Sequence, residues 1–498
     1  MRQLLLGLDI GSSSIKASVV DVATGQSLAT AQSPAEEMPM LAPHPGWAEQ
    51  DPAMWWKHLV ISVQNCLKKS GANGAEVQAI GISYQMHGLV LVDKAQQVLR
   101  PSIIWCDSRA VAIGNQASET LGEKYCLEHL LNSPGNFTAS KLKWVRDNEP
   151  EVFEKIHKIM LPGDYVAMRL SGQVVTTDTG LSEGIFWDYK SQSVSEKLLQ
   201  HYGIEKDLLA PMVPVFGLQG KLQKEAADAL GLKEGVKISY RAGDQPNNAF
   251  SLNVLKAGET AATAGTSGVI YSVTDQNAFD LKSRVNTFIH VSNQAAKRSN
   301  GVLLCVNGTG ILNSWLRKNT RGAGHAFEYE QMNNLAMQVP AGSEGLVILP
   351  FGNGAERILG NRSVNASFHG LDFNHHSEGH LFRAAQEGIV FALKYGFDIL
   401  QEMGLQTRVI RAGHTNMFLS PVFREAFVNT IGAPLELYNT DGATGAALGA
   451  GVGAGIFESA EVAFKGLKTI RTEEPVESLA MQYQAAYTKW KLQLNQIL

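Results

Sequence analysis

Hydrophobic and polar positions along this chain fall into patterns that predict strands alternating with helices. Leu4 to Ile10 is an apolar run typical of a buried strand, and Ile15 to Asp21 alternates as a second strand. The same strand–turn–strand pattern returns at Thr260 to Ala264 and Val269 to Val273. One hairpin opens each half of the chain, and the two similar halves predict a duplicated α/β domain.

Helical periodicity is clearest from Ser377 to Met403, where apolar residues recur about every 3.6 positions. Asp51 and Pro52 predict the start of another helix, as N-cap and first helical residue. Residues 138–148 predict a helix whose lysines we expect to lie in solvent. Short strands are expected at Val77 to Ser83, Leu89 to Val92, Lys237 to Tyr240, Gly301 to Asn307, Leu346 to Leu349 and Val409 to Ala412.

Two segments have unusual composition. Residues 441–457 carry a small residue at almost every position. They predict a helix with a small-residue face that packs very close to its neighbour. Thr176 to Gly180 is polar and contains glycine, which is typical of a loop.

Length and composition limit the class of protein. With 498 residues, the chain is too long for one core, so we expect two domains, 1–246 and 247–498. Hydrophobic residues make up 44%, charged residues 18%, and the net charge is −4, which indicates a soluble protein without a nucleic-acid partner. No run of 18 apolar residues predicts a membrane span. The first apolar run ends at Asp9, too early for a signal peptide.

The four cysteines are Cys66, Cys106, Cys126 and Cys305, and their spacing matches no metal-binding motif. Reduced thiols in a cytoplasmic protein are the expectation that fits this pattern.

The segment from Tyr240 to Tyr271 carries the first candidate chemistry. Asp244 follows a short strand on a glycine-flanked turn, and Gly265, Thr266 and Ser267 form a small-residue turn between strands. Such a turn exposes N–H groups and hydroxyls that suit phosphate oxygens. An acid before a phosphate-binding turn indicates phosphoryl transfer, with Asp244 as general base. The structural alternatives are an N-cap at Asp244 and a plain hairpin turn.

The turn at Gly11, Ser12, Ser13 and Ser14 resembles the later one in composition. It predicts a first phosphate loop, with Asp9 holding Mg²⁺ through water. Taken alone, it also fits a hairpin with a polar turn. The recurrence of the hairpin favours a nucleotide held in a central cleft between two halves.

Polar and aromatic residues follow two other predicted strands. Met86 and His87 come after Val77 to Ser83, and Trp105, Asp107 and Arg109 come after Ile103. An aromatic ring beside an acid and a base suits the apolar face and hydroxyls of a polyol. The alternatives are a packed methionine with a surface histidine, and a core tryptophan with a surface Asp–Arg pair.

In order along nearly the whole chain, these motifs resemble the FGGY carbohydrate kinases, which share a duplicated actin-like (ribonuclease H-like) ATPase fold. Leu8 to Lys16 is similar to the first phosphate loop of that family, and Gly265 to Ser267 is similar to its second phosphate loop. Gly243 to Gln245 is similar to the segment that carries its catalytic base. Its nucleotide turns are similar to Gly308 to Trp315 and Ala412 to His414. Leu161 to Tyr165 and Thr177-Asp178 are also family-like.

The resemblance implies ATP and Mg²⁺ as cofactors, a sugar as the small-molecule partner and no membrane or nucleic-acid partner. A homodimer stays an open expectation. The resemblance implies that Asp244 is the general base and that Asp9 and Asp244 hold the metal. It implies a substrate site formed by Met86, His87, Trp105, Asp107, Arg109 and Gln245. It also implies a nucleotide or phosphate site formed by Gly11, Ser12, Ser13, Ser14, Lys16, Gly265, Thr266, Ser267, Gly310 and Gly413.

Within the family, Gln85 to Val90 and Trp105 to Arg109 are similar to the xylulokinases, which implies phosphorylation of D-xylulose to D-xylulose 5-phosphate. At the base, xylulokinases usually carry the pair Asp-Asn, whereas this chain has Asp244 followed by Gln245. That pair is more like the one in the glycerol and gluconate kinases. The nucleotide turn of the xylulokinases is often Gly-Gly-Gly, whereas this chain has Ala412 to His414 there. The segment Thr177 to Leu181 lacks the Ala-Ser that usually follows the acid in those enzymes.

Two rivals from other classes remain at this point. One is an actin- or chaperone-like ATPase switch, which would not need Met86, His87, Trp105 and Asp107. The other is a sensor without catalysis, which would not need Asp9, Asp244 and both phosphate turns. Inside the kinase class, the alternative is another polyol or sugar acid, such as ribulose, gluconate or glycerol.

Overall fold

A computed structural model describes residues 2–320 and 326–498. The chain forms two compact units, each of which is described by itself. Unit 1 contains Met1–Leu255, Phe288–Asn300 and Thr440–Lys468, and unit 2 contains Lys256–Thr287, Gly301–Asn439 and Thr469–Leu498. Unit 1 therefore includes two segments from the second half of the sequence. The division at residues 246 and 247 concerns sequence halves and stays a prediction.

The main sheet of unit 1 has six strands in the order β11-β12-β5-β1-β2-β3. β1 pairs antiparallel with β2 and parallel with β5, and β5 pairs parallel with β12. The predicted strands at 4–10 and 15–21 are confirmed. The bounds are β1 (Leu4–Ile10), β2 (Ile15–Asp21), β3 (Ser27–Ser33), β5 (Val77–Tyr84), β11 (Phe216–Lys221) and β12 (Lys237–Gly243).

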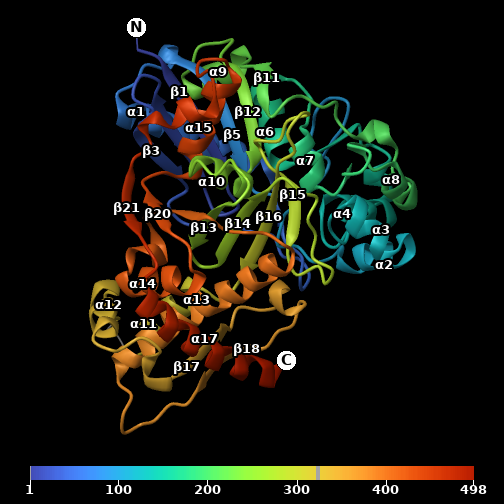
Figure 1. Cartoon of the computed structure of the whole chain (residues 1–498). Helices are drawn as coiled ribbons and strands as arrows, with labels where there is room; N and C mark the ends of the chain where they lie inside the picture. The colour runs from blue at the N-terminus through green and yellow to red at the C-terminus, as the bar shows by residue number, and fades with distance from the viewer. Residues whose placement is uncertain (1, 321–325) are drawn as a thin grey trace. The chain divides into compact units, whose positions relative to one another are not determined.

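Successive side chains of β1 point to opposite faces of the sheet, so this strand contributes to the cores that cover both faces. Leu4, Leu6 and Leu8 belong to one core with α1 (Pro52–Ser70), which starts at the predicted N-cap Asp51. Leu5 belongs to another core, with the alanines of α15 (Gly442–Gly453). Figure 1 shows α15 against β1 and β5.

The approach of α15 to the sheet is close enough to require small residues on both sides. A Cβ atom on Gly7 would clash with the carbonyl oxygen of Ala443, and one on Gly81 would clash with that of Ala446. Backbone therefore packs directly on backbone. The predicted small-residue helix is confirmed.

The main sheet of unit 2 has the order β16-β14-β13-β19-β20-β21, with β15 (Asn286–Ile289) next to β16. β13 pairs antiparallel with β14 and parallel with β19, and β19 pairs parallel with β20. A hairpin beside two parallel strands thus occurs in both units, which confirms the duplication. The bounds are β13 (Glu259–Ala264), β14 (Gly268–Thr274), β16 (Asn300–Val306), β19 (Val409–Gly413), β20 (Leu435–Tyr438) and β21 (Thr469–Glu473).

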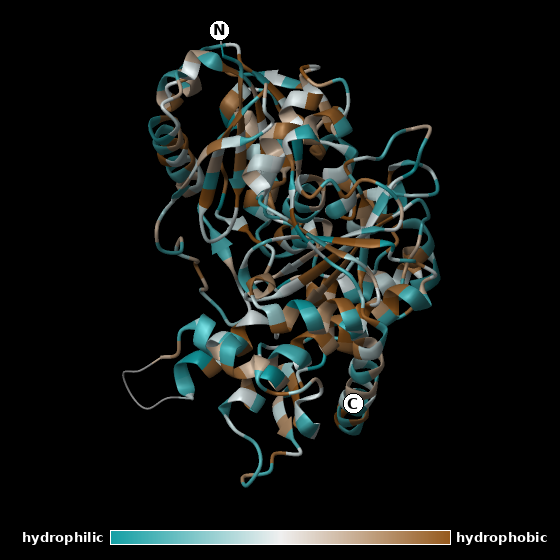
Figure 2. Ribbon diagram, turned by 60° about the vertical axis from the view of Figure 1, so that its left-hand side comes forward, coloured by the Kyte–Doolittle hydropathy of each residue, from teal (hydrophilic) through white to brown (hydrophobic). Residues whose placement is uncertain are grey.

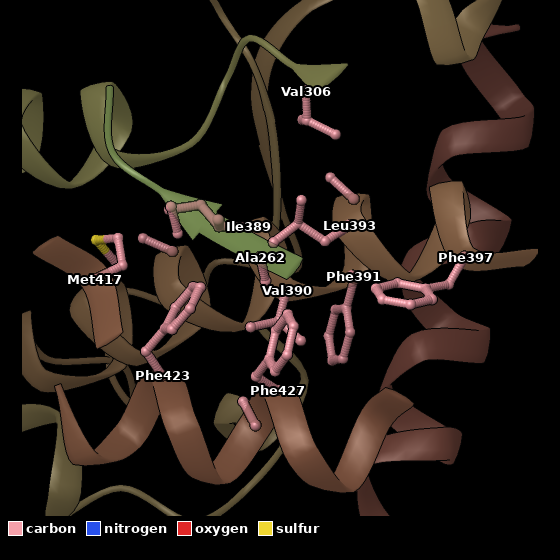
Figure 3. Close-up of a cluster of buried hydrophobic side chains, with 14 of the residues drawn as sticks. Ala262, Val306, Ile389, Val390, Phe391, Leu393, Phe397, Met417, Phe423 and Phe427 are labelled. Carbon is pink, nitrogen blue, oxygen red and sulfur yellow. The ribbon is translucent and has the colours of Figure 1, made fainter. Parts of the chain in front are cut away.

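Helix α13 (Glu378–Glu402) lies in the core of unit 2, as its period predicts. Figure 3 shows Ile389 and Leu393 near Ala262 of β13, with Phe427 of α14 (Pro421–Ile431) close by. The long C-terminal helix α17 (Glu477–Ile497) carries both hydrophobic and hydrophilic residues (Figure 2). Its buried Trp490 donates a hydrogen bond to the carbonyl oxygen of Ile348.

The prediction that Thr176 to Gly180 forms a loop is wrong from Asp178 onward, because helix α7 (Asp178–Glu183) begins at that residue. The side chain of Thr177 accepts a hydrogen bond from the N–H of Gly180 at 3.1 Å and caps this short helix. Thr179 to Glu183 are all buried. Tertiary packing therefore outweighs the loop-like composition.

The remaining elements complete the two units. In unit 1 they are β4 (Glu49–Gln50), β6 (Val90–Val92), β7 (Ser102–Ile103), β8 (Lys158–Met160), β9 (Trp187–Asp188), β10 (Ser193–Val194), α2 (Val111–Leu121), α3 (Glu123–His129), α4 (Thr138–Asn148), α5 (Pro150–Phe153), α6 (Pro162–Ser171), α8 (Glu196–Tyr202), α9 (Lys224–Leu230), α10 (Asp244–Ser251) and α16 (Ala460–Ala463). In unit 2 they are β17 (Val347–Phe351), β18 (Asn365–His369), α11 (Gly310–Asn319) and α12 (Tyr329–Met337). Within the described ranges, no helix is both long and apolar enough to cross a membrane.

Candidate functional site

Two predicted site acids meet at one edge of the sheet of unit 1. Because β1, β5 and β12 run parallel, their carboxyl ends lie together. Asp9 stands opposite Ser83, which in turn stands opposite Ala242, two residues before Asp244. The hydroxyl of Ser83 donates to Asp9 Oδ1 at 2.9 Å. Sequence reasoning did not select Ser83, although a polar residue at the end of an apolar strand was a usable signal.

Burial and mutual repulsion control the charges of these two acids. Burial raises the pKa of Asp244 to about 7, and the negative charge of Asp9 contributes in the same direction. Burial also raises the pKa of Asp9, which the positive charge of Lys16 opposes. A carboxyl group that titrates near neutral pH can both accept and release a proton there. This property suits Asp244 to general-base chemistry.

The residues around Asp9 fit a divalent cation chemically. Asp9 and Asp244 repel each other, and the negative charge of Asp441, which caps α15, further raises the pKa of Asp9. A bound Mg²⁺ would relieve this repulsion. Magnesium sites commonly use one or two carboxylates together with waters and phosphate oxygens. Asp441 had no motif that would have singled it out.

The Met86–His87 turn packs directly against the residue before Asp244. A Cβ atom on Gly243 would stand 2.6 Å from Met86 Cγ and 2.6 Å from Glu183 Oε2, so an added methyl group would force these side chains to move. Burial raises the pKa of Glu183 well above its usual value, and the charge of Asp244 adds to this effect. Met86, Glu183 and Asp244 are therefore brought together, although Glu183 carried no motif signal.

His87 is held in an uncommon backbone conformation, with φ 61°. Its Nδ1 lies 2.9 Å from the carbonyl oxygen of Glu183, and its ring packs against Phe137 and Phe288. The expectation that α4 holds only solvated lysines is wrong, because Lys141 is fully buried. Its Nζ donates to the carbonyl oxygens of His87 and Ile104, both at 2.9 Å.

Burial lowers the pKa of Lys141 to about 7, although the negative charge of Asp107 opposes the shift. A buried amine needs acceptors, and the two strand-exit turns supply them. Lys141 thereby links the turn that carries His87 to the turn that carries Trp105. Only the tertiary fold could reveal this role, since the lysine pattern of the helix looks like an exposed face.

The predicted Trp105, Asp107 and Arg109 set divides into two parts. Trp105 is 53% exposed, and its Nε1 donates to Ser12 Oγ in the first predicted phosphate loop at 3.3 Å. Asp107 and Arg109 form a buried ion pair, with Asp107 Oδ2 2.6 Å from Arg109 Nη2. Arg109 also pairs with Glu49 at 2.7 Å. The charged groups of this pair are bonded within the protein, and their contact with a sugar stays a prediction.

The first predicted phosphate loop turns its carbonyl groups toward the protein. Ser12 O accepts from Gln50 Nε2 at 2.7 Å, Ser13 O from Met38 N at 2.8 Å, and Ser14 O from Gly11 N at 3.2 Å. In the described part of the chain, the N–H groups of residues 12–14 have no hydrogen-bond acceptor. Such groups are available to an anion.

The second predicted phosphate loop, in unit 2, has the same arrangement. Gly265 O accepts from Gly310 N at 2.9 Å, and Thr266 O accepts from Ile311 N at 3.3 Å. The hydroxyl of Thr309 also donates to both carbonyl oxygens, at 3.1 and 2.9 Å. A Cβ atom on Gly310 would clash with the Gly265 carbonyl oxygen, so the predicted glycine is required.

A cavity of about 460 Å³ lies beside this loop and is large enough for a small organic ligand. The predicted residues Gly265, Thr266 and Gly310 line it, whereas Ser267 and Gly413 are not among its lining residues in the described chain. Gly413 ends β19 two residues before Thr415, which does line the cavity. The other lining residues are Ala264, Ile311, Asn313, Ser314, Tyr329, Asn333, Asn416, Met417, Leu419 and Ser420. Those on α12 had no sequence signal, because polar residues on a helix are usually just exposed.

One other cluster in unit 2 contains metal-ligating residue types. Glu344, His375 and His380 bring their ligand atoms within 4.8 Å of one another, and no cysteine takes part in this cluster. However, His380 Nδ1 accepts from the backbone N–H of Ser377 at 3.0 Å, so the proton of a neutral ring sits on Nε2. That N–H donates to Glu344 Oε2 at 2.7 Å. His380 therefore caps a helix and binds a carboxylate, and lacks the lone pair that a metal would need.

Comparison with known proteins covers nearly the whole chain. The N-terminal domain of the FGGY family of carbohydrate kinases matches residues 4–251, and the C-terminal domain matches residues 260–455. Xylulose kinase of Bacillus subtilis (strain 168) is 29% identical over 466 residues, 92% of this chain and 89% of that protein. Xylulose kinase of Rhodospirillum rubrum has a solved structure with TM-score 0.87 and 26% identity, covering 99% of each chain. Gluconate kinase of Lactobacillus acidophilus has the same fold, with TM-score 0.88, 24% identity and coverage of 100% of this chain and 98% of that one.

The chain belongs to the FGGY family of carbohydrate kinases. Its fold is the two-domain α/β fold of that family, with actin-like (ribonuclease H-like) ATPase architecture. It is therefore a kinase that acts on a carbohydrate and uses ATP. This conclusion removes the ATPase switch and the non-catalytic sensor as readings of the sequence.

Proposed function

We propose that this protein transfers the γ-phosphoryl group of Mg–ATP to D-xylulose, forming D-xylulose 5-phosphate. The observation that carries the proposal is the packing of Met86 against Gly243, directly before Asp244. Through this packing, the turn with Met86 and His87, which resembles that of the xylulokinases, lies beside Asp244, whose pKa burial raises to about 7. The curated relatives named xylulose kinase support the choice of sugar.

In this mechanism Asp244 accepts the proton of the terminal hydroxyl while the hydroxyl oxygen attacks the γ-phosphorus, and the bond from that phosphorus to the bridging oxygen breaks so that ADP leaves. A single carboxylate is sufficient because the transition state of phosphoryl transfer is loose. Asp9 and Asp244 would hold Mg²⁺, which neutralises the charge that develops on the phosphate oxygens. The N–H groups of residues 12–14 and of the Gly265–Ser267 turn orient phosphate oxygens, so that positioning contributes much of the rate.

The charge of the unit 1 site supports a neutral sugar. Asp9, Asp244 and Glu183 are all acids, while Lys141 is committed to two carbonyl oxygens and Arg109 is committed to Asp107 and Glu49. Lys16, whose positive charge lowers the pKa of Asp9, is assigned here to the phosphates, so among the described residues of this site a sugar acid such as gluconate would bring its negative charge to acids whose cations are already engaged. The geometry therefore favours a ketose over a sugar acid.

A second candidate function is phosphorylation of another polyol, such as ribulose or glycerol. The observation that supports it is Gln245, whose side chain hydrogen-bonds to the carboxylate of Asp244 and so lowers its pKa against the effect of burial. A glutamine at this position reaches further than the asparagine usual in xylulokinases. It could thereby change the space left for the substrate hydroxyl.

The test is ADP release with Mg–ATP and a panel of D-xylulose, D-ribulose, L-ribulose, gluconate and glycerol. We expect kcat/KM for D-xylulose to exceed every other value by at least about tenfold, because a misplaced hydroxyl leaves polar groups of the site unpaired. A dominant signal from ribulose or glycerol would replace D-xylulose with that substrate. A dominant gluconate signal would contradict the charge argument.

The role of the base is tested with Asp244→Asn, which keeps the shape of the side chain and removes its basicity. We expect kcat to fall at least about a hundredfold, the usual contribution of general-base catalysis. Asp228→Asn is the matched control, because Asp228 is exposed on α9 of the same unit. Near-normal turnover by Asp244→Asn would contradict the assignment.

A further inference from the structure

The side chain of Gln50 is a buried junction of hydrogen bonds in unit 1. Gln50 ends β4 and is fully buried. Its Nε2 donates to the carbonyl oxygen of Ser12 at 2.7 Å, and its Oε1 accepts from Trp55 Nε1 at 3.0 Å. Longer contacts join Nε2 to the carbonyl oxygen of Pro39 at 3.5 Å and Oε1 to Gln85 Nε2 at 3.4 Å. All four hydrogen-bonding positions of the amide are thereby used.

The orientation of the Gln50 amide follows from two neighbours that each have a single role. The indole N–H of Trp55 can only donate, so the Gln50 atom beside it must be the oxygen Oε1. The carbonyl oxygen of Ser12 can only accept, so the Gln50 atom beside it must be Nε2. A flipped amide would set donor against donor at Trp55 and acceptor against acceptor at Ser12. The two constraints agree and fix the orientation.

Gln50 sets the direction of the peptide group between Ser12 and Ser13. This peptide is trans, so its carbonyl oxygen and its N–H point in opposite directions. Because the Ser12 carbonyl oxygen is held by Gln50, the Ser13 N–H points away from the buried junction. That N–H has no acceptor in the part of the chain that the structure describes. A buried side chain thus aims a free donor of the first predicted phosphate loop.

A second, weaker arm of the junction reaches the turn with Met86 and His87. Gln85, the residue before this turn, is 2% exposed and contacts Gln50 through its Nε2. Its Oε1 is buried without a partner in the described chain, so this contact is the one hydrogen bond recorded there for the side chain. At 3.4 Å it is longer than the 2.7 Å bond to Ser12 and therefore weaker. Gln50 holds the phosphate loop more firmly than it holds this turn.

We propose that Gln50 is a positioning residue for phosphoryl transfer, which fixes the peptide between Ser12 and Ser13 so that the Ser13 N–H meets a phosphate oxygen. The proposal rests on the proposed function, because that function assigns residues 12–14 to the phosphates. Gln50 itself touches no substrate. A donor that is already aimed needs no reorganisation when charge develops on the transferred group. Loss of Gln50 should therefore affect the phosphate end of the nucleotide and the turnover.

The direct test is Gln50→Met, which keeps the length of the side chain and removes all four hydrogen bonds. We expect Kd for the non-hydrolysable analogue Mg–AMPPNP to rise at least about fivefold and kcat to fall at least about tenfold. Kd for AMP, which lacks the β- and γ-phosphates, should stay within about twofold. KM for the sugar should rise at most about threefold, since Gln85 is held by the weaker bond. Equal changes in Kd for AMP and Mg–AMPPNP would overturn the positioning role.

Gln219→Met is the matched control. Gln219 is a buried glutamine on β11 of the same sheet, and its Nε2 donates to the carbonyl oxygens of Pro214 and Val215 at 2.9 and 3.0 Å. The control loses the same kind of bonds at a strand that carries no predicted site residue. Its Kd values for AMP and Mg–AMPPNP should both stay within about twofold of wild type. If it weakened Mg–AMPPNP as much as Gln50→Met does, general loss of stability would replace the proposed role.

Hydrogen exchange in the nucleotide-free protein tests the loop itself. The N–H of Met38 donates to the carbonyl oxygen of Ser13 at 2.8 Å, and the N–H of Gly11 donates to that of Ser14 at 3.2 Å. In Gln50→Met both amides should exchange at least about tenfold faster, because the loop can open locally. In Gln219→Met they should exchange as in wild type. Unchanged exchange in Gln50→Met would contradict a loop held by Gln50.

Trp55→Phe is a milder variant, which removes the indole N–H that fixes the amide. We expect Kd for Mg–AMPPNP to rise about threefold in the native background and less than twofold in a Gln50→Met background. Additive effects would contradict a shared junction. Failure of the proposed function is seen separately. Wild-type protein that phosphorylates no sugar, with Mg–AMPPNP affinity still lost in Gln50→Met, would overturn that function alone, whereas normal binding and turnover by Gln50→Met would overturn only the role of Gln50.

Discussion

At the scale of single residues, the site of unit 1 is dominated by groups whose proton affinity burial has changed. Burial raises the pKa of Asp244 and of Glu183, and it lowers the pKa of Lys141. Desolvation opposes charge on acids and bases alike, so the shifts have opposite signs for one physical cause. Such perturbed groups concentrate where a protein carries out chemistry.

The raised pKa of Asp244 predicts a pH profile for the reaction. A base must be deprotonated, so kcat/KM for the sugar should rise with pH and then level off, and bound Mg²⁺ should shift the midpoint below the pKa of about 7 that burial gives Asp244 in the metal-free site. The measurement is initial rate against pH from 5.5 to 8.5 at saturating Mg–ATP. A rate independent of pH below 7 would contradict this assignment.

Lys141 is the control for that profile, because burial lowers its pKa to about 7 as well. Both the charged and the neutral amine can donate to the carbonyl oxygens of His87 and Ile104. The Lys141→Met variant should therefore keep the same midpoint, although its affinity for the sugar should fall. Loss of the midpoint in that variant would assign the titration to Lys141.

At the scale of elements, backbone-to-backbone packing of α15 on the sheet of unit 1 is the least tolerant contact. Small residues on β1, β5 and α15 let the helix approach closely. Close-packed interiors cannot absorb an added methyl group without moving a neighbour. Because β1, β5 and α15 also carry or border Asp9, this packing supports the catalytic edge of the sheet.

Gly81→Ala tests this packing. Its Cβ would clash with the carbonyl oxygen of Ala446, so we expect a loss of about 3 kcal/mol in the free energy of unfolding. Gly71→Ala is the comparison, because Gly71 has φ 63° and nothing within 4 Å, which should cost only about 1 kcal/mol of backbone strain. Denaturant unfolding followed by tryptophan fluorescence measures both, and equal losses would argue against the packing account.

At the scale of the whole molecule, neither compact unit is one continuous segment of the chain. Unit 1 takes α15 and α16 from residues 440–468, and unit 2 takes β21 and α17 from the segment that follows. The sheet of unit 1 would expose Leu5, Val20 and Ala79 if α15 were absent. An exposed apolar sheet face of that kind leads to aggregation or incomplete folding.

This arrangement predicts that residues 1–255 do not fold alone. The fragment should lack a cooperative thermal transition and should bind a hydrophobic dye, because one face of its sheet is uncovered. The same fragment joined by flexible linkers to residues 288–300 and 440–468, the other two segments of unit 1, should recover a cooperative transition. A sharp transition in residues 1–255 without the added segment would contradict the predicted dependence on α15.

Much of the fold could be predicted from local patterns. The strands at 4–10 and 15–21, the helix that begins after Asp51 and the helix from Ser377 to Met403 all follow from periodicity and caps. The predictions that were wrong rested on local sequence patterns, whose effect was outweighed by packing against distant elements. Lys141 looked solvated on its helix, and Thr176 to Gly180 looked like a loop, yet both are buried against other elements.

The sequence by itself determined the family, the strand-end position of Asp9, Met86 and Asp244, and the two small-residue turns, because each depends on residues near one another in the chain. Only the tertiary structure decided which distant groups meet. Glu183 beside Met86 and Gly243, Lys141 beneath two turns, and Gln50 between Ser12 and Gln85 all join segments far apart in sequence. No local pattern encodes such contacts, since burial and hydrogen-bond direction are properties of the packed molecule.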